Sequence, residues 1–311
     1  MPLSSLFYTE SGLRTVWKIV IFLAVTLGLL TVLFYPAMFL PLDVLFKDTR
    51  LLIIINSFPI FIAVLFSSWT ILRFVERKKF AVLGFAFHNT FTGEIKKGLI
   101  LGSGIISIVF LVSLLTNAVS VSWSGAGISL LIINFIIYAF IFFIQCAGEE
   151  AFFRGYLFQI IMEKINKITA VVIMSVLFSI VHMLNPEISI FALCNVFLFG
   201  VLLSAAYIKT RSLWLPTALH FSWNFSQSFI FSFPVSGIKL NHTIFAVRNN
   251  GSVLISGGEF GPEASLLTSI VTLIVIAYII VSEKFSISDD MKTILKYNGK
   301  EKENDEDKRN L

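Results

Sequence analysis

Two adjacent carboxylates and an arginine interrupt a long apolar stretch of the sequence. Glu149, Glu150 and Arg154 stand within the otherwise largely apolar residues 130–162. An ionisable group at bilayer depth costs on the order of 2.5–3.5 kcal/mol on insertion scales, so such residues are usually paired and face the protein interior. Four-residue spacing puts Glu150 and Arg154 on one face of a helix. The cluster indicates a functional site, and the alternative is a set of interfacial charges between two helices.

Two histidines and an asparagine add to this set from other apolar stretches. His182 ends the run Phe178–His182, while His220 and Asn224 are four residues apart and share a helical face. A carboxylate beside an imidazole can deprotonate a water molecule for attack on a carbonyl carbon. A second imidazole and a carboxamide can donate hydrogen bonds to the resulting oxyanion. These residue types fit hydrolysis of an amide without a serine or cysteine nucleophile.

The same residue types leave two other chemistries open. Glu and His are zinc ligands, although the His-Glu-x-x-His pattern that strongly favours zinc is absent from the sequence. Glu and His also form proton relays in transporters, but the sequence has no internal repeat. The only cysteines, Cys146 and Cys194, lie in apolar segments and are too few for a disulfide framework. We expect both to be structural, because adjacent carboxylates disfavour a thiolate at Cys146.

The elements that must position these residues are membrane helices. The 311-residue chain is 56% hydrophobic and only 14% charged, with a mean hydropathy of +0.86, whereas soluble domains are about a quarter charged. Several apolar runs reach the ~18–20 residues that cross a bilayer. The net charge of +5 comes from basic residues spread over loops and a tail, which is typical of membrane proteins and argues against nucleic acid as a partner. We expect an all-α, multi-pass transmembrane helical bundle in the lipid bilayer of a cell membrane.

Eight membrane spans are predicted, and the fourth carries the two carboxylates. This fourth span is one long helix that submerges Glu149 and Glu150 below its cytoplasmic end. A polar turn at residues 120–127 precedes it, and a long loop separates the last two spans. The first span is too long for a cleavable signal peptide and has no clear cleavage site. The predicted spans cover residues 16–40, 51–74, 98–119, 128–164, 168–184, 188–208, 213–233 and 264–281.

Eight spans place both chain ends on the same side of the membrane. Cytoplasmic loops carry the excess of Lys and Arg in membrane proteins. Of the 24 Lys and Arg, those that fall on the side opposite the chain ends are only Lys47, Arg50, Lys239 and Arg248. We therefore expect both termini to be cytoplasmic. Residues 1–282 form the membrane domain, and residues 283–311 form a charged, mobile cytoplasmic tail.

Three short motifs together resemble the CPBP family of intramembrane proteases. Residues 149–154 are similar to its EExxxR motif, residues 178–182 to FxxxH and residues 220–224 to HxxxN, in the family's order. The family includes the Rce-type CAAX prenyl endopeptidases and the bacteriocin-processing or immunity (Abi) proteins. The motifs lie within residues 143–224 of an expected family core at about 130–282. The loop at residues 257–261 is similar to a glycine-rich feature before the last family helix.

The resemblance implies catalytic roles for four residues. Glu149 would activate the hydrolytic water together with His182. His220 and Asn224 would form the oxyanion hole. The family's glutamate mechanism replaces an earlier description as metalloproteases, so neither a metal nor another cofactor is expected.

The resemblance also implies supporting roles for three residues. Glu150 and Arg154 would orient the site, with Arg154 neutralising Glu150 across one helical turn. Phe178 would pack beside His182.

These motifs predict an intramembrane endopeptidase that cleaves a peptide or protein near the cytoplasmic membrane face. Water would enter from that face between the fourth, fifth and seventh spans. One family branch suggests a prenylated CAAX substrate, and another suggests a bacteriocin or pheromone precursor. The alternatives are a non-proteolytic immunity protein that binds a partner with the same cluster, and a proton-coupled transporter.

Overall fold

The computed structural model describes residues 7–9, 12–39 and 49–296. The end of the first predicted span at Leu40, the loop with Lys47 and the tail from residue 297 onward lie outside these ranges. The first half of the chain contains β1 (Tyr8–Thr9), β2 (Gly12–Leu13), α2 (Thr15–Phe34), η1 (Tyr35–Phe39), α4 (Thr49–Thr70), η2 (Ile71–Val75), η3 (Phe80–Leu83), α5 (Phe91–Leu115), β3 (Val119–Trp123) and α6 (Ile128–Glu150). The second half contains η4 (Ala151–Gly155), α7 (Tyr156–Lys164), α8 (Lys167–Val181), η5 (His182–Leu184), α9 (Ile190–Thr210), α10 (Trp214–Phe225), η6 (Ser226–Ile230), β4 (Phe245–Asn249), α11 (Val253–Ser256), η7 (Pro262–Ala264) and α12 (Leu266–Val281).

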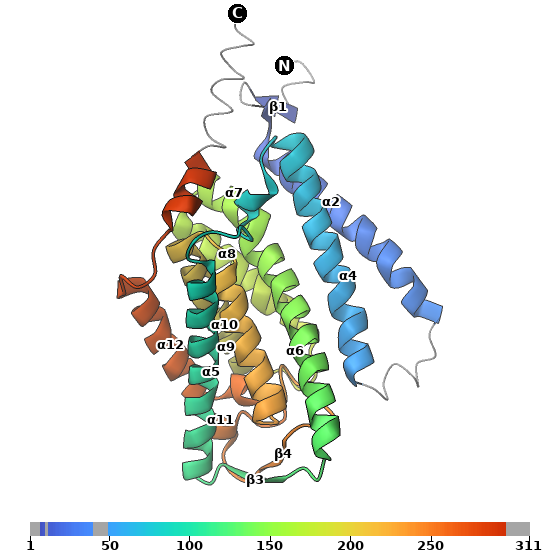
Figure 1. The fold of residues 1–311 in the computed structure, drawn as a ribbon, viewed down its shortest axis with the longest axis vertical. Helices are drawn as coiled ribbons and strands as arrows, with labels where there is room; N and C mark the ends of the chain where they lie inside the picture. The colour runs from blue at the N-terminus through green and yellow to red at the C-terminus, as the bar shows by residue number, and fades with distance from the viewer. Residues whose placement is uncertain (1–6, 10–11, 40–48, 297–311) are drawn as a thin grey trace, which may run out of the picture.

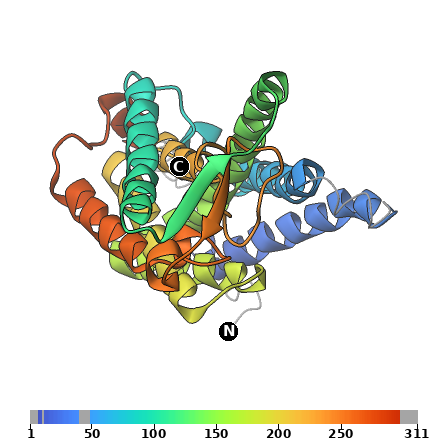
Figure 2. The ribbon, with the colours of Figure 1, turned by 90° about the horizontal axis from the view of Figure 1, so that it is seen from below.

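The helices form a bundle with two distinct ends, which confirms the predicted all-α class (Figure 1). β1 and residues 289–296 lie at one end, called here the β1 end. β3 and β4 lie at the other, the β3–β4 end. Figure 2, seen from the β3–β4 end, shows this pair of strands crossing the middle of the bundle. The chain therefore passes repeatedly between two end surfaces, as a multi-pass membrane protein does.

Six helical segments are long and apolar enough to cross a membrane, and α12 is a shorter apolar helix. α10 continues directly into the π-helical turn η6, and most of its side chains are buried, including Ser222, Asn224 and Ser226. Because α5, α6 and α9 pack against it, this segment needs little lipid-facing apolar surface. The count of eight spans and the cytoplasmic termini stay predictions. The six segments are Thr15–Phe34, Thr49–Val75, Phe91–Leu115, Ile128–Lys164, Lys167–Leu184 and Ile190–Thr210.

The long fourth helix predicted around the carboxylates is confirmed. α6, η4 and α7 form a continuous helical segment from Ile128 to Lys164. Its π-helical turn begins directly after Glu150 and ends at Gly155. Single π-helical turns within α-helices are frequent at functional sites. This turn separates the carboxylates, at the end of α6, from α7.

The predicted start of the third span differs from the start of its helix. α5 begins at Phe91, not at residue 98, so Lys96 and Lys97 belong to its first turns. The sequence placed them in a loop because they are charged, but a lysine near a helix end can extend its ammonium group toward the polar region. The Lys97 Nζ atom donates to the Lys284 carbonyl oxygen over 2.6 Å. The charge pattern therefore hid the start of this helix.

A β-ribbon replaces part of two predicted loops. The predicted polar turn at residues 120–127 begins as a strand, because β3 pairs antiparallel with β4, with Val121 opposite Val247. β4 lies in the long loop between the last two predicted spans. Pairing between segments so distant in sequence leaves no local signal beyond the short Val-Ser-Val-Ser alternation of β3. The ribbon fixes the loop that follows α10 against the β3–β4 end of the bundle.

The first part of the predicted mobile tail packs against the bundle. Residues 289–296 are helical, and Phe285 and Met291 are buried. The Asp290 carboxylate accepts a hydrogen bond from the Asn89 backbone N–H over 2.8 Å. The prediction of a mobile tail from residue 283 is therefore wrong through residue 296. Its high polar content concealed two apolar side chains that anchor it.

Close contact between α5 and α10 sets the position of the helix that carries His220. A Cβ atom added at Gly102 would overlap the Leu219 carbonyl oxygen and the Ser222 hydroxyl. The Ser222 hydroxyl also donates to the Gly98 carbonyl oxygen over 3.2 Å. Two glycines on one face of α5 thus allow the backbones to approach, as small residues commonly do between membrane helices.

We expect Gly102→Ala to destabilise the protein by about 1–3 kcal/mol, because an extra methyl group in a close-packed contact forces the helices apart. Thermal unfolding of the purified protein in detergent measures the change. Gly104→Ala is the matched control, because a Cβ atom at Gly104 meets no atom within 4 Å. Equal unfolding midpoints for the two variants would contradict the packing argument.

Candidate active site

The buried ion pair on the long helix is formed by Glu150 and Arg154. Arg154 Nη1 donates to Glu150 Oε1 over 3.2 Å, and both side chains have 0% exposure. Arg154 Nη2 donates to the Gly200 carbonyl oxygen over 2.9 Å. Its guanidinium carbon lies 4.7 Å from the centroid of the Phe178 ring. Arg154 therefore compensates the Glu150 charge, as the spacing predicted, and links the long helix to α8 and α9.

His220 lies between the two carboxylates. Its Nδ1 is 2.9 Å from Glu150 Oε1, and its Nε2 is 3.9 Å from Glu149 Oε2. A carboxylate that accepts from Nδ1–H fixes the orientation of the imidazole ring and leaves Nε2 directed elsewhere. The Phe199 ring packs against the imidazole, with centroids 5.3 Å apart. Glu150 thus positions His220, and Nε2 faces the side where Glu149 lies.

Glu149 differs from its neighbour because its side chain reaches a cavity. Its side chain is 19% exposed, whereas that of Glu150 is fully buried. Gln145 Nε2 donates to Glu149 Oε1 over 3.1 Å. Among the described residues, none donates a hydrogen bond to Glu149 Oε2. This oxygen is buried and lies toward His220, while the Glu149 side chain as a whole lines the cavity.

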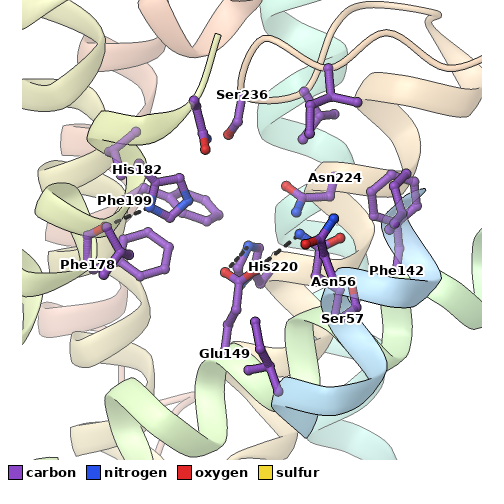
Figure 3. A pocket seen from close by; sticks show the side chains of 18 of the residues that line it. Asn56, Ser57, Phe142, Glu149, Phe178, His182, Phe199, His220, Asn224 and Ser236 are labelled. Carbon is purple, nitrogen blue, oxygen red and sulfur yellow. Dashed lines mark hydrogen bonds and ion pairs between the residues drawn. The ribbon is translucent and has the colours of Figure 1, made fainter. Parts of the chain in front are cut away.

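His182 approaches the same cavity from the end of α8. It is the first residue of η5, and its Nδ1 is 2.6 Å from the Phe178 carbonyl oxygen. That contact makes Nδ1 the donor and leaves Nε2 as an acceptor. The Phe178 ring packs beside the imidazole, with centroids 4.6 Å apart, so the predicted packing is present. Figure 3 shows His182 and Glu149 on different sides of one space.

Glu149 and His182 are predicted to activate one water molecule together, and both side chains line the cavity. The structure adds a closer contact that the sequence did not predict. The imidazole within 4 Å of the Glu149 carboxylate is that of His220. The order of motifs along a sequence does not set distances between helices, so this contact had no sequence signal.

Asn224 lies one helical turn beyond His220 on α10. Both side chains line the cavity (Figure 3). The Asn224 backbone carbonyl oxygen accepts from the Ser228 hydroxyl, and the side-chain Nδ2 atom donates to the Cys146 sulfur over 3.7 Å. The amide is therefore held in place while it remains at the cavity wall. Cys146 is buried and is absent from the residues described as lining the cavity.

The cavity has a volume of about 660 Å³, within the range of about 300–1,000 Å³ that is usual for ligand sites. It lies among α2, α4, α6, α8, α9 and α10. The loop residues that line it all come from the β3–β4 end, namely Asn185, Pro186, Val235, Ser236, Ile238, Leu240 and Glu263. The sequence analysis predicted that water enters from the cytoplasmic face. The cavity instead extends toward the β3–β4 end.

The sequence reasoning missed a second polar group in the cavity. Ser236 and Glu263 come from loops that the motifs do not include, and Figure 3 shows Ser236 across the cavity from Glu149. A usable signal was present: Glu263 is an isolated acidic residue directly before the last apolar segment, two residues after Gly261. Polar residues of α4, Asn56 and Ser57, complete the wall.

Metal ligation has no clear residue set in the described part of the chain. No group of three or more His, Cys, Asp or Glu side chains there has a geometry suited to holding a metal ion. The nearest approach to such a group is His220 with its two glutamates, but Glu150 and its partner Arg154 form a compensated pair.

Comparison with known families supports the resemblance to CAAX proteases that the three motifs indicated. A family model described as type II CAAX prenyl endopeptidase Rce1-like matches residues 131–226, which contain all three motifs. This match supports assignment to the CPBP/CAAX protease family. A search among curated proteins found no match.

Proposed function

We propose that this protein is an intramembrane endopeptidase of the CAAX type that acts in the cell membrane, with Glu149 as the general base. One observation carries the proposal: the partly exposed Glu149 side chain lines a cavity that His182, His220 and Asn224 also line. The family match supports a protease. The geometry adds a role for each of these side chains.

In the first step, a water molecule beside Glu149 attacks the carbonyl carbon of the scissile peptide bond. The Glu149 carboxylate accepts the proton that the water loses as its oxygen bonds to carbon. His182, whose Nε2 is left as an acceptor, holds the second hydrogen of the water. The products of this step are a tetrahedral intermediate with an oxyanion and a protonated Glu149.

In the second step, His220 and Asn224 stabilise the oxyanion and the intermediate collapses. His220 is doubly protonated in this step, so Nδ1–H donates to Glu150 and Nε2–H donates to the oxyanion. Nε2 of His220 and Nδ2 of Asn224 are then donors from one face of α10, and each such donor is worth about 2.7–4 kcal/mol of barrier. The C–N bond breaks, and the departing nitrogen takes the proton that Glu149 accepted. Glu150 and Arg154 act indirectly, because Glu150 holds Nδ1 of His220 and Arg154 compensates the charge of Glu150.

The cavity also limits where the substrate can enter. Its exposed lining side chains include Val181 at the end of α8, Leu184 in η5 and Asn56 on α4. A peptide can therefore reach Glu149 from the side of the bundle between α4 and η5, or from the β3–β4 end. This route replaces the entry from the cytoplasmic end that the sequence suggested. If the termini are cytoplasmic, the substrate approaches from the opposite half of the bilayer.

The proposal is tested with the protein reconstituted in liposomes with a panel of membrane peptides, and products are identified by mass spectrometry. The wild-type protein should cleave susceptible peptides, and Glu149→Ala and His182→Ala should each lower the rate by about 10²–10⁴-fold, as loss of an acid–base group does. Glu163→Ala is the matched control, because Glu163 is an exposed carboxylate on the same long helix. Unchanged cleavage by both cavity variants would overturn the assigned roles.

A second arm distinguishes a metal-dependent mechanism. Phenanthroline should leave the wild-type rate unchanged, because the proposed water is activated by a carboxylate and an imidazole. Inhibition by phenanthroline that added zinc reverses would instead assign water activation to a metal ion.

A further inference from the structure

Glu263 occupies a fixed position in the cavity wall at the β3–β4 end. It lies in the 3₁₀ turn η7, and its carboxylate accepts hydrogen bonds from the backbone N–H and the hydroxyl of Ser236. The preceding Gly261 has a φ of +108°, and a Cβ atom there would overlap the Pro234 carbonyl oxygen. The two loops that carry Ser236 and Glu263 are therefore in close contact and position each other.

The backbone beside Glu263 is held from the opposite side by α9. Asn195 Nδ2 donates to the carbonyl oxygens of Glu263 and Ser265, over 2.7 and 2.8 Å. Asn195 Oδ1 accepts from the Ser269 hydroxyl over 2.6 Å, which sets the orientation of the amide. Asn195 also lines the cavity. Glu263 is thus held on a rigid wall, which reduces the entropy lost when a ligand binds.

The charge of Glu263 is not matched by a lysine or arginine among the described lining residues of the cavity. Among the described lining residues there are two carboxylates, those of Glu149 and Glu263, and neither lysine nor arginine. The ion pairs of the described residues leave Glu263 out. Burial raises the pKa of Glu263 to about 7, although Ser236, Gln227 and the more distant His220 act in the opposite direction. A carboxylate has about four acceptor positions, so the two donors of Ser236 and that of Gln227 leave room for a donor from a ligand.

We propose that Glu263 is a specificity-determining residue that binds a lysine or arginine side chain of the substrate. This inference rests on the proposed function, because it places the basic side chain in the same cavity as the scissile bond. The basic residue then lies on the β3–β4 side of that bond. The largely apolar lining strengthens the attraction, because a charge pair is weakly screened away from water.

The simpler explanation is that Glu263 only ties two loops together through Ser236. A neutral amide would serve that purpose, since its oxygen can accept from the Ser236 backbone N–H. Glu263→Gln therefore separates the two explanations: it retains an acceptor and removes the charge. If Glu263 has only this structural role, Glu263→Gln should not change the preference between basic and neutral peptides.

The experiment compares two peptides that differ at one position, lysine in one and methionine in the other, with that position scanned along a cleaved membrane peptide. Wild-type protein should favour the lysine peptide in kcat/KM, mainly through a lower KM. Glu263→Gln should reduce the lysine-to-methionine ratio by about tenfold or more, as loss of a charged hydrogen bond does. Glu259→Gln, in the same loop but exposed and outside the lining residues, should leave the ratio unchanged.

A binding measurement keeps this inference separate from the proposed catalysis. Both proteins in this comparison carry Glu149→Gln, so neither cleavage nor the Glu149 charge contributes, and the second also carries Glu263→Gln. Fluorescence anisotropy with labelled lysine and methionine peptides gives the Kd of each protein for each peptide. The preference for lysine should be present in the first protein and absent from the second. Equal preference in the two proteins would overturn the role of Glu263, even if cleavage occurs. Loss of preference without any cleavage by wild-type protein would support Glu263 as a binding residue and refute the proposed hydrolysis.

Discussion

Replacing His220 by alanine should lower kcat by at least about 10²–10³-fold, the usual effect of removing one oxyanion donor. The effect should be large because one imidazole contacts both carboxylates, at 2.9 Å from Glu150 and 3.9 Å from Glu149. On the proposed mechanism, the substitution removes a donor to the oxyanion and also leaves Glu150 with Arg154 as its remaining charged partner. Steady-state kinetics on a cleaved membrane peptide measures the change.

Two further variants test the interpretation of this loss. His220→Gln keeps a donor and should recover part of the rate, whereas Asn224→Ala should lose activity with KM little changed. Circular dichroism and the unfolding midpoint must show that each variant is folded, since His220 is buried. A folded His220→Ala variant with kcat within a few-fold of wild type would remove His220 from the mechanism.

The sequence predicted the parts of the site that depend on spacing within one helix. The ion pair of Glu150 with Arg154 follows from the i, i+4 geometry, and the structure contains it. The long helix through Glu149 follows from the apolar residues that continue beyond Gly155. The packing of Phe178 beside His182 is another contact across one turn. Each of these depends on residues at most one turn apart.

The sequence could not predict contacts between helices. His220 is 70 residues from Glu150, and its position depends on close packing of α10 against α5 through Gly102. Pairing of β3 with β4 depends on where two distant loops meet. Glu263 was missed for the same reason, because only the folded chain brings η7 to the cavity that contains Glu149. These errors arise from tertiary packing, which a local pattern does not encode.

The adjacent carboxylates have different roles because they point in different directions. Successive residues of an α-helix are rotated by ~100°, so Glu149 and Glu150 cannot face the same surroundings. Glu150 faces the protein interior, where Arg154 and His220 contact it. Glu149 faces the cavity and keeps one oxygen without a hydrogen-bond donor among the described residues. In the proposed mechanism, this difference lets one carboxylate support the site while the other takes part in proton transfer.

Arg154→Met should destabilise the protein by about 3–5 kcal/mol, because removing one partner of a buried pair leaves the other charge uncompensated. Arg154 is fully buried and also holds the Gly200 carbonyl oxygen on α9. Methionine fills much of the same volume, so the loss reports charge and hydrogen bonding more than a cavity. Denaturant unfolding in detergent micelles, followed by circular dichroism, gives the change in free energy.

A second substitution isolates the charge. Glu150→Gln in the Arg154→Met background removes the uncompensated carboxylate, so the double variant should be more stable than Arg154→Met alone. Lys292→Met is the matched control, because Lys292 pairs with Asp289 across one helical turn on the exposed surface, where an ion pair contributes little. If Arg154→Met and Lys292→Met unfold at the same denaturant concentration, the buried pair does not stabilise the bundle. A double variant less stable than Arg154→Met would show that Glu150 is held mainly by His220, and that the imidazole, not the guanidinium, carries its charge compensation.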